Sequence, residues 1–186
     1  MEVTYGTTVE HMARDGGPSA WKYRLPHVML TVDALLTWDT LSGVRKSETF
    51  LYRDGYYDGK EHFFRGFAEV EVTSAGDDSV EAGRVVHRFD VGSEDRYRKG
   101  LSLSERTESE GRVLATKERR YGDCEVSGVS TGGKVPVRFL CLTHERTLEQ
   151  EGKHASEWAA LERELRYDGC GNVTESRDLG VTSIGG

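Results

Sequence analysis

The chain has 186 residues, of which 36% are hydrophobic and 31% are charged, and its formal net charge is −7. This length suits one ordinary domain or two small ones, and it can bury a core without metal or disulfide support. Acidic and basic residues alternate without a basic stripe, which argues against a nucleic-acid partner. No apolar run reaches the roughly 18 residues needed to cross a bilayer, so we expect no membrane insertion by this segment.

The N-terminal stretch "MEVTYGTTVEHMARDGG" lacks the basic-then-apolar pattern of a signal peptide. Nothing in the sequence therefore directs the chain to the secretory route. Glycine is frequent at 22 residues and proline is scarce at 3, which suits a chain that turns often and keeps its backbone donors for strand pairing.

Strand signals dominate the first half of the chain. Residues 28–52 are rich in β-branched and apolar side chains around the turn sequence "DTLSG", which predicts a hairpin. Residues 67–74 alternate between apolar side chains and glutamate, and the "AGDD" turn at 75–78 leads to another strand over 84–91. The first half therefore reads as consecutive antiparallel strands.

The second half continues this pattern with less regularity. Residues 93–111 are polar and favour a loop or a short helix, whereas 112–124 and 135–149 are extended. The glycine-rich stretch 128–134 predicts a flexible linker. We expect a bend or a short helix near 154–160, and then a strand from about 161.

These patterns predict an all-β fold class, with antiparallel hairpins in a curved, extended sheet. Residues 1–186 are expected to form a single β-rich unit. An array of hairpins of this kind leaves sheet edges that need partners. Three tryptophans, Trp21, Trp38 and Trp158, are expected to anchor the core.

The segment "YRDGYYDGKEHFFRGF", residues 52–67, concentrates aromatic and charged side chains. A calcium site would use Asp54, Asp58 and Glu61, although the ligand spacing of an EF-hand is absent. A hydrolase would use Asp58, Glu61 and His62 as acid and base. Both alternatives are weaker than a structural interpretation.

In the structural interpretation the two Asp-Gly pairs of this segment, Asp54-Gly55 and Asp58-Gly59, form turns. The aromatic rings on either side bury apolar area, and Arg65 pairs with Asp58 or Glu61 to lock the loop. Gly66 allows a close approach of backbone or ring. We therefore expect no catalytic residue, no metal site and no cofactor.

The three cysteines, Cys124, Cys141 and Cys170, are widely spaced and form no CxxC motif. A zinc site is therefore not expected. The spacing favours three free thiols, with a single disulfide as the alternative.

The segment "WKYRLPHVMLTVDALLTWDTLSGVRKSETFLYRDGYYDGKEHFFRGFAEVEV", over residues 21–72, resembles the B component of bacterial insecticidal toxin complexes (Tc toxins) and the related SpvB-type proteins. Family members carry Trp and Leu-Pro-Phe-Pro-Val, then a D-x-x-S-G hairpin and a GYYDG-x-E-R-E-F-R-G-F-G segment. This chain differs in having His27, His62-Phe63 and Ala68 in place of the family residues. Its C-terminal "LERELRYDGCGNVTESRDLG", within 161–180, resembles the YD repeat of Rhs proteins.

The resemblance implies a section from the middle of a large, hollow β-shell that encloses a toxic polypeptide. The partners would be the remainder of the shell polypeptide or a C-type toxin component, together with the enclosed polypeptide. The location would be a secreted or bacterial cell-associated toxin complex, held in the bacterial cytoplasm before export. The structural motif would comprise Tyr52, Gly55, Tyr56, Tyr57, Asp58, Gly59, Glu61, Phe64, Arg65, Gly66, Phe67, Tyr167, Asp168, Gly171 and Asn172. The alternative function is a small β-domain that binds carbohydrate or calcium.

Overall fold

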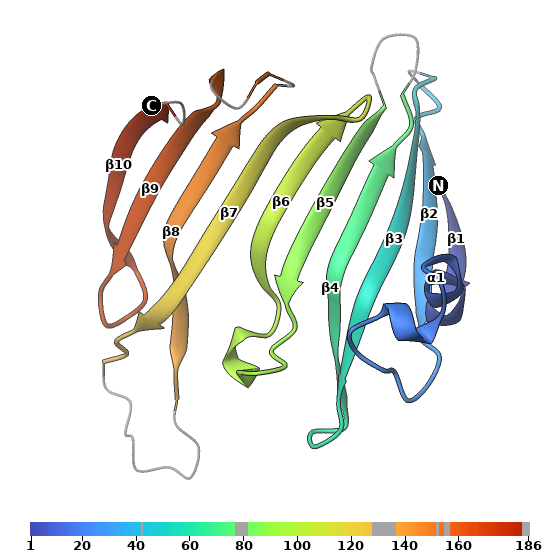
Figure 1. Ribbon diagram of the computed structural model, residues 1–186, viewed down its shortest axis with the longest axis horizontal. Coiled ribbons are helices and arrows are strands. Elements are labelled where there is room, and N and C mark those ends of the chain that lie inside the picture. Colours follow the sequence, from blue (N-terminus) through green and yellow to red (C-terminus); the bar gives the residue numbers. More distant parts are fainter. Residues whose placement is uncertain (42, 77–81, 128–136, 152, 155–156, 184–186) are drawn as a thin grey trace.

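A computed structural model describes residues 1–186 except 42, 77–81, 128–136, 152, 155–156 and 184–186. The described residues form one ten-stranded antiparallel sheet in which the strands lie side by side in sequence order, from β1 at one edge to β10 at the other (Figure 1). This arrangement confirms the predicted all-β fold of antiparallel hairpins in an extended sheet. The strands are β1 (Glu2–Thr7), β2 (Leu30–Trp38), β3 (Arg45–Asp58), β4 (Phe63–Ser74), β5 (Gly83–Asp90), β6 (Leu101–Ser109), β7 (Arg112–Cys124), β8 (Phe139–Glu149), β9 (Ala159–Tyr167) and β10 (Val173–Ser183).

A short helix, α1 (Thr8–Arg14), lies beside β1 and β2 at one end of the sheet (Figure 1). Sequence analysis missed it, although Thr7 and Glu10 form a capping box that closes its first turn. The bend or short helix expected near 154–160 falls partly on residues that the structure does not describe, and the hydrogen bond described there has the i→i+3 spacing of a 3₁₀ turn. In that region Glu157 N–H donates to the carbonyl of His154 at 2.9 Å, residues 155–156 lie outside the described part, and β9 begins at Ala159. No helix in the described residues is long and apolar enough to cross a membrane.

The polar segment 93–111 forms a 3₁₀ turn, η2 (Arg96–Arg98), followed by strand β6, so the expectation of a loop or helix there is wrong for its second part. A charged side chain of β6 has its partner on the neighbouring strand β5. Arg84 of β5 donates to Glu108 of β6 at 2.7 Å and to Glu71 of β4 at 2.5 Å. Such cross-strand pairs stabilise a sheet where apolar alternation is missing. The proposed linker 128–134 lies outside the described residues.

Few of the described side chains in this sheet are fully buried. The buried hydrophobic residues are Trp21, Val86, Val91, Cys141 and Ala160. Most strand positions are half-buried on both faces, as expected for a single layer that is not covered from end to end. Of the three tryptophans expected in the core, Trp21 is buried, Trp158 is half-buried and Trp38 is 44% exposed, so the expectation is wrong for Trp38.

Candidate functional site

The corner between β3 and β4 is closed by the carboxylate of Asp58. Asp58 accepts hydrogen bonds from the backbone N–H groups of Lys60 at 2.8 Å and Glu61 at 3.1 Å. The hydrogen bonds from Glu61 and Lys60 lower the pKa of Asp58. The carboxylate therefore stays ionised and holds a tight reversal in which Gly59 follows Asp58, the geometry of an Asx turn.

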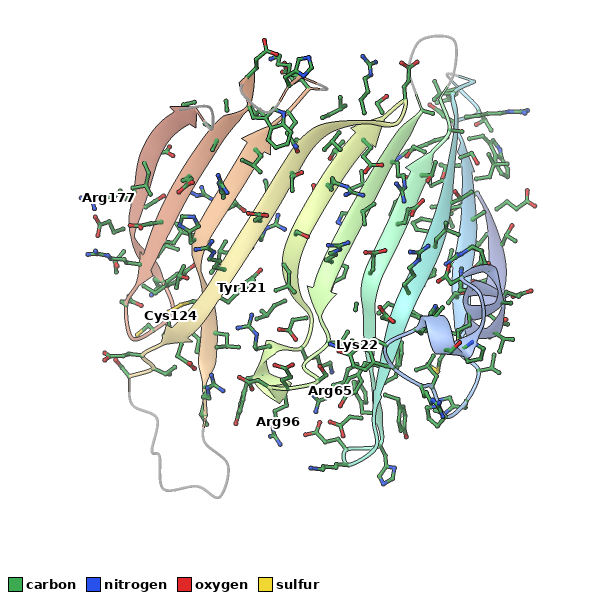
Figure 2. The ribbon with its side chains drawn as sticks, viewed as in Figure 1. Lys22, Arg65, Arg96, Tyr121, Cys124 and Arg177 are labelled. Atoms are coloured by element: carbon green, nitrogen blue, oxygen red, sulfur yellow. A yellow bond between two sulfur atoms is a disulfide. The ribbon has the colours of Figure 1, made fainter. Side chains whose placement is uncertain are left out.

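Arg65 connects this corner to the loop after β5. Its side chain is only 3% exposed, and its Nη2 donates to Asp58 and also to Glu61 at 3.0 Å. Its Nη1 donates to the carbonyl of Gly92 at 2.8 Å. Arg65 thus pairs with both carboxylates that were considered as alternative partners, and it also ties the β3–β4 hairpin to the β5–β6 connection. Figure 2 shows Arg65 beside Arg96 at the same end of the sheet.

Asp54-Gly55 is not a turn, contrary to the sequence expectation, because both residues lie inside β3. Asp54 adopts a left-handed conformation with φ 53°, which aspartate tolerates better than most residues. Its carboxylate accepts a hydrogen bond from the backbone N–H of Lys22. Gly55 leaves room for a close contact, since a Cβ there would lie 3.1 Å from the ring of Phe67 and 3.2 Å from Leu25. This Asp-Gly pair therefore docks the 18–29 segment onto the sheet.

Aromatic rings of β3 and β4 hold that same segment. Tyr56 packs on Tyr23 with 4.9 Å between ring centroids, and Tyr57 packs on His27 at 5.2 Å. Phe67 contacts three further rings, those of Tyr52, Phe64 and Trp21, at centroid distances of 4.8, 5.2 and 6.2 Å. Aromatic pairs at these distances add stability beyond simple burial. Gly66 has φ 105° at a bulge where the β3–β4 register shifts.

The hairpin between β9 and β10 has a second Asx-type turn. Asp168 accepts hydrogen bonds from the backbone N–H groups of Cys170 and Asn172, both at 2.9 Å, and its own N–H donates to the carbonyl of Asn172 at 3.0 Å. Hydrogen bonds from Asn172 and Cys170 lower the pKa of Asp168. Gly171 supplies the left-handed position with φ 85°. The hydroxyl of Tyr167 donates to the carbonyl of Leu142 at 2.9 Å, which anchors the hairpin to β8.

The carboxylates considered for catalysis or calcium binding are all engaged in these contacts. Among the described residues, no group of three or more His, Cys, Asp and Glu side chains is placed to hold a metal ion. Asp58 and Glu61 share Arg65, while Asp54 faces Lys22 on another side of the corner. A surface hollow of about 690 Å³ lies next to Asp58 and Glu61, between the corner and η2.

Sequence reasoning missed one buried contact and favoured the wrong one of two alternatives for the cysteines. His11 of α1 is 3% exposed and lies 3.1 Å from the carboxylate of Asp33, with Arg14 Nη1 2.9 Å from its other ring nitrogen. Its spacing from Asp33 in the sequence gives no signal for this contact. Cys124 and Cys141 form a disulfide between β7 and β8, which overturns the expectation of three free thiols.

The fold and its corners define the class of protein: an open, all-antiparallel sheet of consecutive hairpins, cross-linked by Asx turns, an arginine and aromatic rings. Residues 1–90 match the family described as the insecticide toxin TcdB middle/N-terminal region. The predicted resemblance to the B component of insecticidal toxin complexes is therefore confirmed. No curated protein matches the chain.

Solved structures with the same fold extend the likeness over almost the whole chain. The structure of TcdB2-TccC3 is 17% identical with a TM-score of 0.76, and the match covers 94% of this chain and 11% of that one. TcdB2-TccC3-Cdc42 is 16% identical with a TM-score of 0.72, covering 95% and 11%. The Photorhabdus luminescens Tc holotoxin pore is 16% identical with a TM-score of 0.75, covering 98% and 12%. This chain thus spans about a tenth of the length of the solved chains that it matches.

Proposed function

We propose that this chain is a non-catalytic section of the wall of a Tc/Rhs-type β-shell that encloses a polypeptide. The observation that carries the proposal is the open sheet itself. Its strands follow one another from β1 to β10, and in the described residues each of these two outer strands has a neighbour on one side only. The same fold occupies 11% of the matched chain in the TcdB2-TccC3 structure, as one section of a much longer polypeptide.

The side chains at the corners support a structural role. Asp58 and Glu61 both pair with Arg65, so these charges serve to fix the hairpin. In this proposal residues 1–186 act as one unit, and the hairpin ending in Tyr167-Asp168 is a YD-type repeat of the Rhs class. The partners are the remainder of the shell, a C-type component and the enclosed polypeptide, in a secreted toxin complex.

The proposal is tested by protease protection. The natural polypeptide that contains this chain is co-produced with its C-type component, and the assembly is treated with protease. A segment that resists digestion in the native assembly, and becomes digestible when the assembly is opened by denaturant, is the expected result. An assembly whose segments are all digested at the rate of the unfolded polypeptide would refute enclosure.

Calcium titration of the purified chain separates this function from the alternative. A wall section keeps the same melting temperature in low-millimolar calcium, whereas a calcium-binding β-domain gains several degrees because the ligand stabilises the folded state only. Magnesium at equal ionic strength controls for screening of surface charge.

A further inference from the structure

The tip of the β9–β10 hairpin contacts the segment that follows Cys124. The carbonyl of Gly169 accepts a hydrogen bond from the backbone N–H of Ser127 at 2.7 Å. A Cβ added to Gly169 would lie 1.9 Å from the hydroxyl oxygen of Ser127, so the two segments are in direct contact. Three extended residues span at most about 10 Å, so Cys124 lies within that distance of Ser127, the residue that contacts the tip.

The other side of the same tip contacts the strand that carries Cys141. The ring of Phe139, two residues before Cys141, lies 3.2 Å from the position that a Cβ would take on Gly171. Phe139 also packs against Tyr167 at the base of the hairpin, with 6.5 Å between ring centroids. The hairpin tip therefore bridges the two strands that the disulfide joins.

Cys170 lies between these two contacts, and it is free and exposed. The disulfide partners differ in exposure: Cys124 is half-buried, whereas Cys141 is 3% exposed. An incoming thiolate therefore has better access to the sulfur of Cys124. Figure 2 shows the disulfide at the end of β7, next to the β9–β10 turn in Figure 1.

We propose that Cys170 exchanges with the Cys124–Cys141 disulfide within the same molecule. The thiolate of Cys170 attacks Sγ of Cys124, a Cys124–Cys170 bond forms, and the Cys124–Cys141 bond breaks. The electron pair of the broken bond leaves on Sγ of Cys141, which takes up a proton from solvent. The number of disulfides and of thiols is unchanged, so the step needs no oxidant or reductant.

The exchange changes which elements are covalently joined. Before it, the end of β7 is tied to β8; after it, the end of β7 is tied to the tip of the β9–β10 hairpin and β8 is released. A disulfide requires Cα atoms within about 4.4–6.8 Å, so the exchange needs Cys170 and Cys124 to approach to that separation. The hydrogen bond between Gly169 and Ser127 and the Asp168 turn hold the tip in place next to the end of β7.

Tryptic peptide mapping tests the proposal, because the three cysteines fall on separate tryptic peptides: 121–134, 139–146 and 167–177. The purified oxidised chain is incubated without added thiol near pH 8.5 or pH 6.5, then acidified, alkylated and digested. We expect a linked pair of the 121–134 and 167–177 peptides to accumulate with time, and faster at the higher pH, where more thiolate is present. The alkyl label should move in parallel from Cys170 to Cys141.

Two variants and a dilution of the native chain make the result decisive. Cys170→Ser should show no exchange, and a tenfold dilution of the native chain should leave the fraction of exchanged product unchanged if the step is intramolecular. Cys141→Ser, oxidised mildly with oxidised glutathione, should form the Cys124–Cys170 bond in the monomer. The proposal is overturned if the native chain keeps only Cys124–Cys141 under all conditions, or if Cys141→Ser yields only glutathione adducts and dimers. It is independent of the shell function, because each outcome is read on the chain alone.

Discussion

Replacing Arg65 by methionine should destabilise the fold more than any other single change at the β3–β4 corner. Methionine keeps the apolar stem but removes three hydrogen bonds, those to Asp58, Glu61 and the carbonyl of Gly92. A net hydrogen bond to a charged group contributes about 1.5–3 kcal/mol, and a buried carbonyl left without a donor costs about 1–3 kcal/mol.

These free-energy contributions are not fully additive, because the carboxylates that lose Arg65 are hydrated by solvent instead. The side chain of Glu61 is 43% exposed, so its loss of a partner is largely compensated by solvent. Breaking a fully buried ion pair costs about 3–5 kcal/mol, and this partly open site should fall at the lower limit, near 3 kcal/mol. For a domain of this size that corresponds to a fall of about 6–12 °C in melting temperature.

Urea unfolding followed by circular dichroism measures this loss directly. Arg65→Lys should recover part of the stability, since an ammonium group restores one donor and the charge but not the fork geometry. Arg96→Met is the matched control, because Arg96 reaches Glu61 at 3.1 Å from a side chain that is 51% exposed, and such a pair contributes at most about 1 kcal/mol. If Arg65→Met and Arg96→Met destabilise the chain equally, the central role assigned to Arg65 is wrong.

Three further predictions concern pH, the disulfide and the second turn. The pKa of Asp58 is lowered in the folded chain, so its ionised carboxylate stabilises the fold fully above the unfolded value near 3.9, and this stability is lost as pH falls through the lower folded pKa. The urea concentration at the unfolding midpoint should therefore decrease below about pH 4. Asp58→Asn should make this decrease smaller. Reducing the bond between Cys124 and Cys141, 17 residues apart, should cost about 3 kcal/mol, because the bond restricts the unfolded chain. The loss should appear as a lower urea midpoint in dithiothreitol, and an unchanged midpoint would contradict this argument. Gly171→Ala should lower stability by about 1–2 kcal/mol, since the residue has φ 85° and the added Cβ would contact the ring of Phe139. Gly59→Ala is the control and should change stability little, because no atom lies within 4 Å of the added Cβ. Equal shifts in melting temperature for the two variants would contradict the conformational argument.

The parts of the fold that local pattern determines were predictable from the sequence. The 28–52 hairpin and the strands over 67–74, 84–91 and 112–124 follow from alternation and turn residues, and their observed bounds are close to those expected. Strand β6 was not predicted, because most of its side chains are polar. The strand is stabilised by contacts with residues that are distant in sequence, such as the hydrogen bond from Arg84 to Glu108.

The corner was predictable in composition but not in geometry. Asp54-Gly55 and Asp58-Gly59 look alike as dipeptides, yet only the second reverses the chain. The difference comes from the 18–29 segment, whose packing on Phe67 and whose Lys22 N–H keep the first pair inside a continuous strand. A tertiary contact overrides the turn preference of the first Asp-Gly pair. The disulfide likewise depends on tertiary structure, because the pairing of β7 with β8 brings the two cysteines together.

The distribution of apolar side chains explains why this sheet suits a wall more than an independent domain. The interior positions are half-buried on both faces, and the cross-strand charges compensate one another through residues such as Arg84. Exposed apolar groups are also present on both outer strands: Tyr5 of β1 is 67% exposed, and Val181 of β10 is 65% exposed. An unpaired strand with exposed apolar side chains is a site for pairing with another strand, and soluble proteins usually protect it. A neighbouring strand on each side would bury those groups and use the free backbone donors. The proposed shell therefore supplies what the isolated sheet lacks at its edges and leaves its polar centre unchanged.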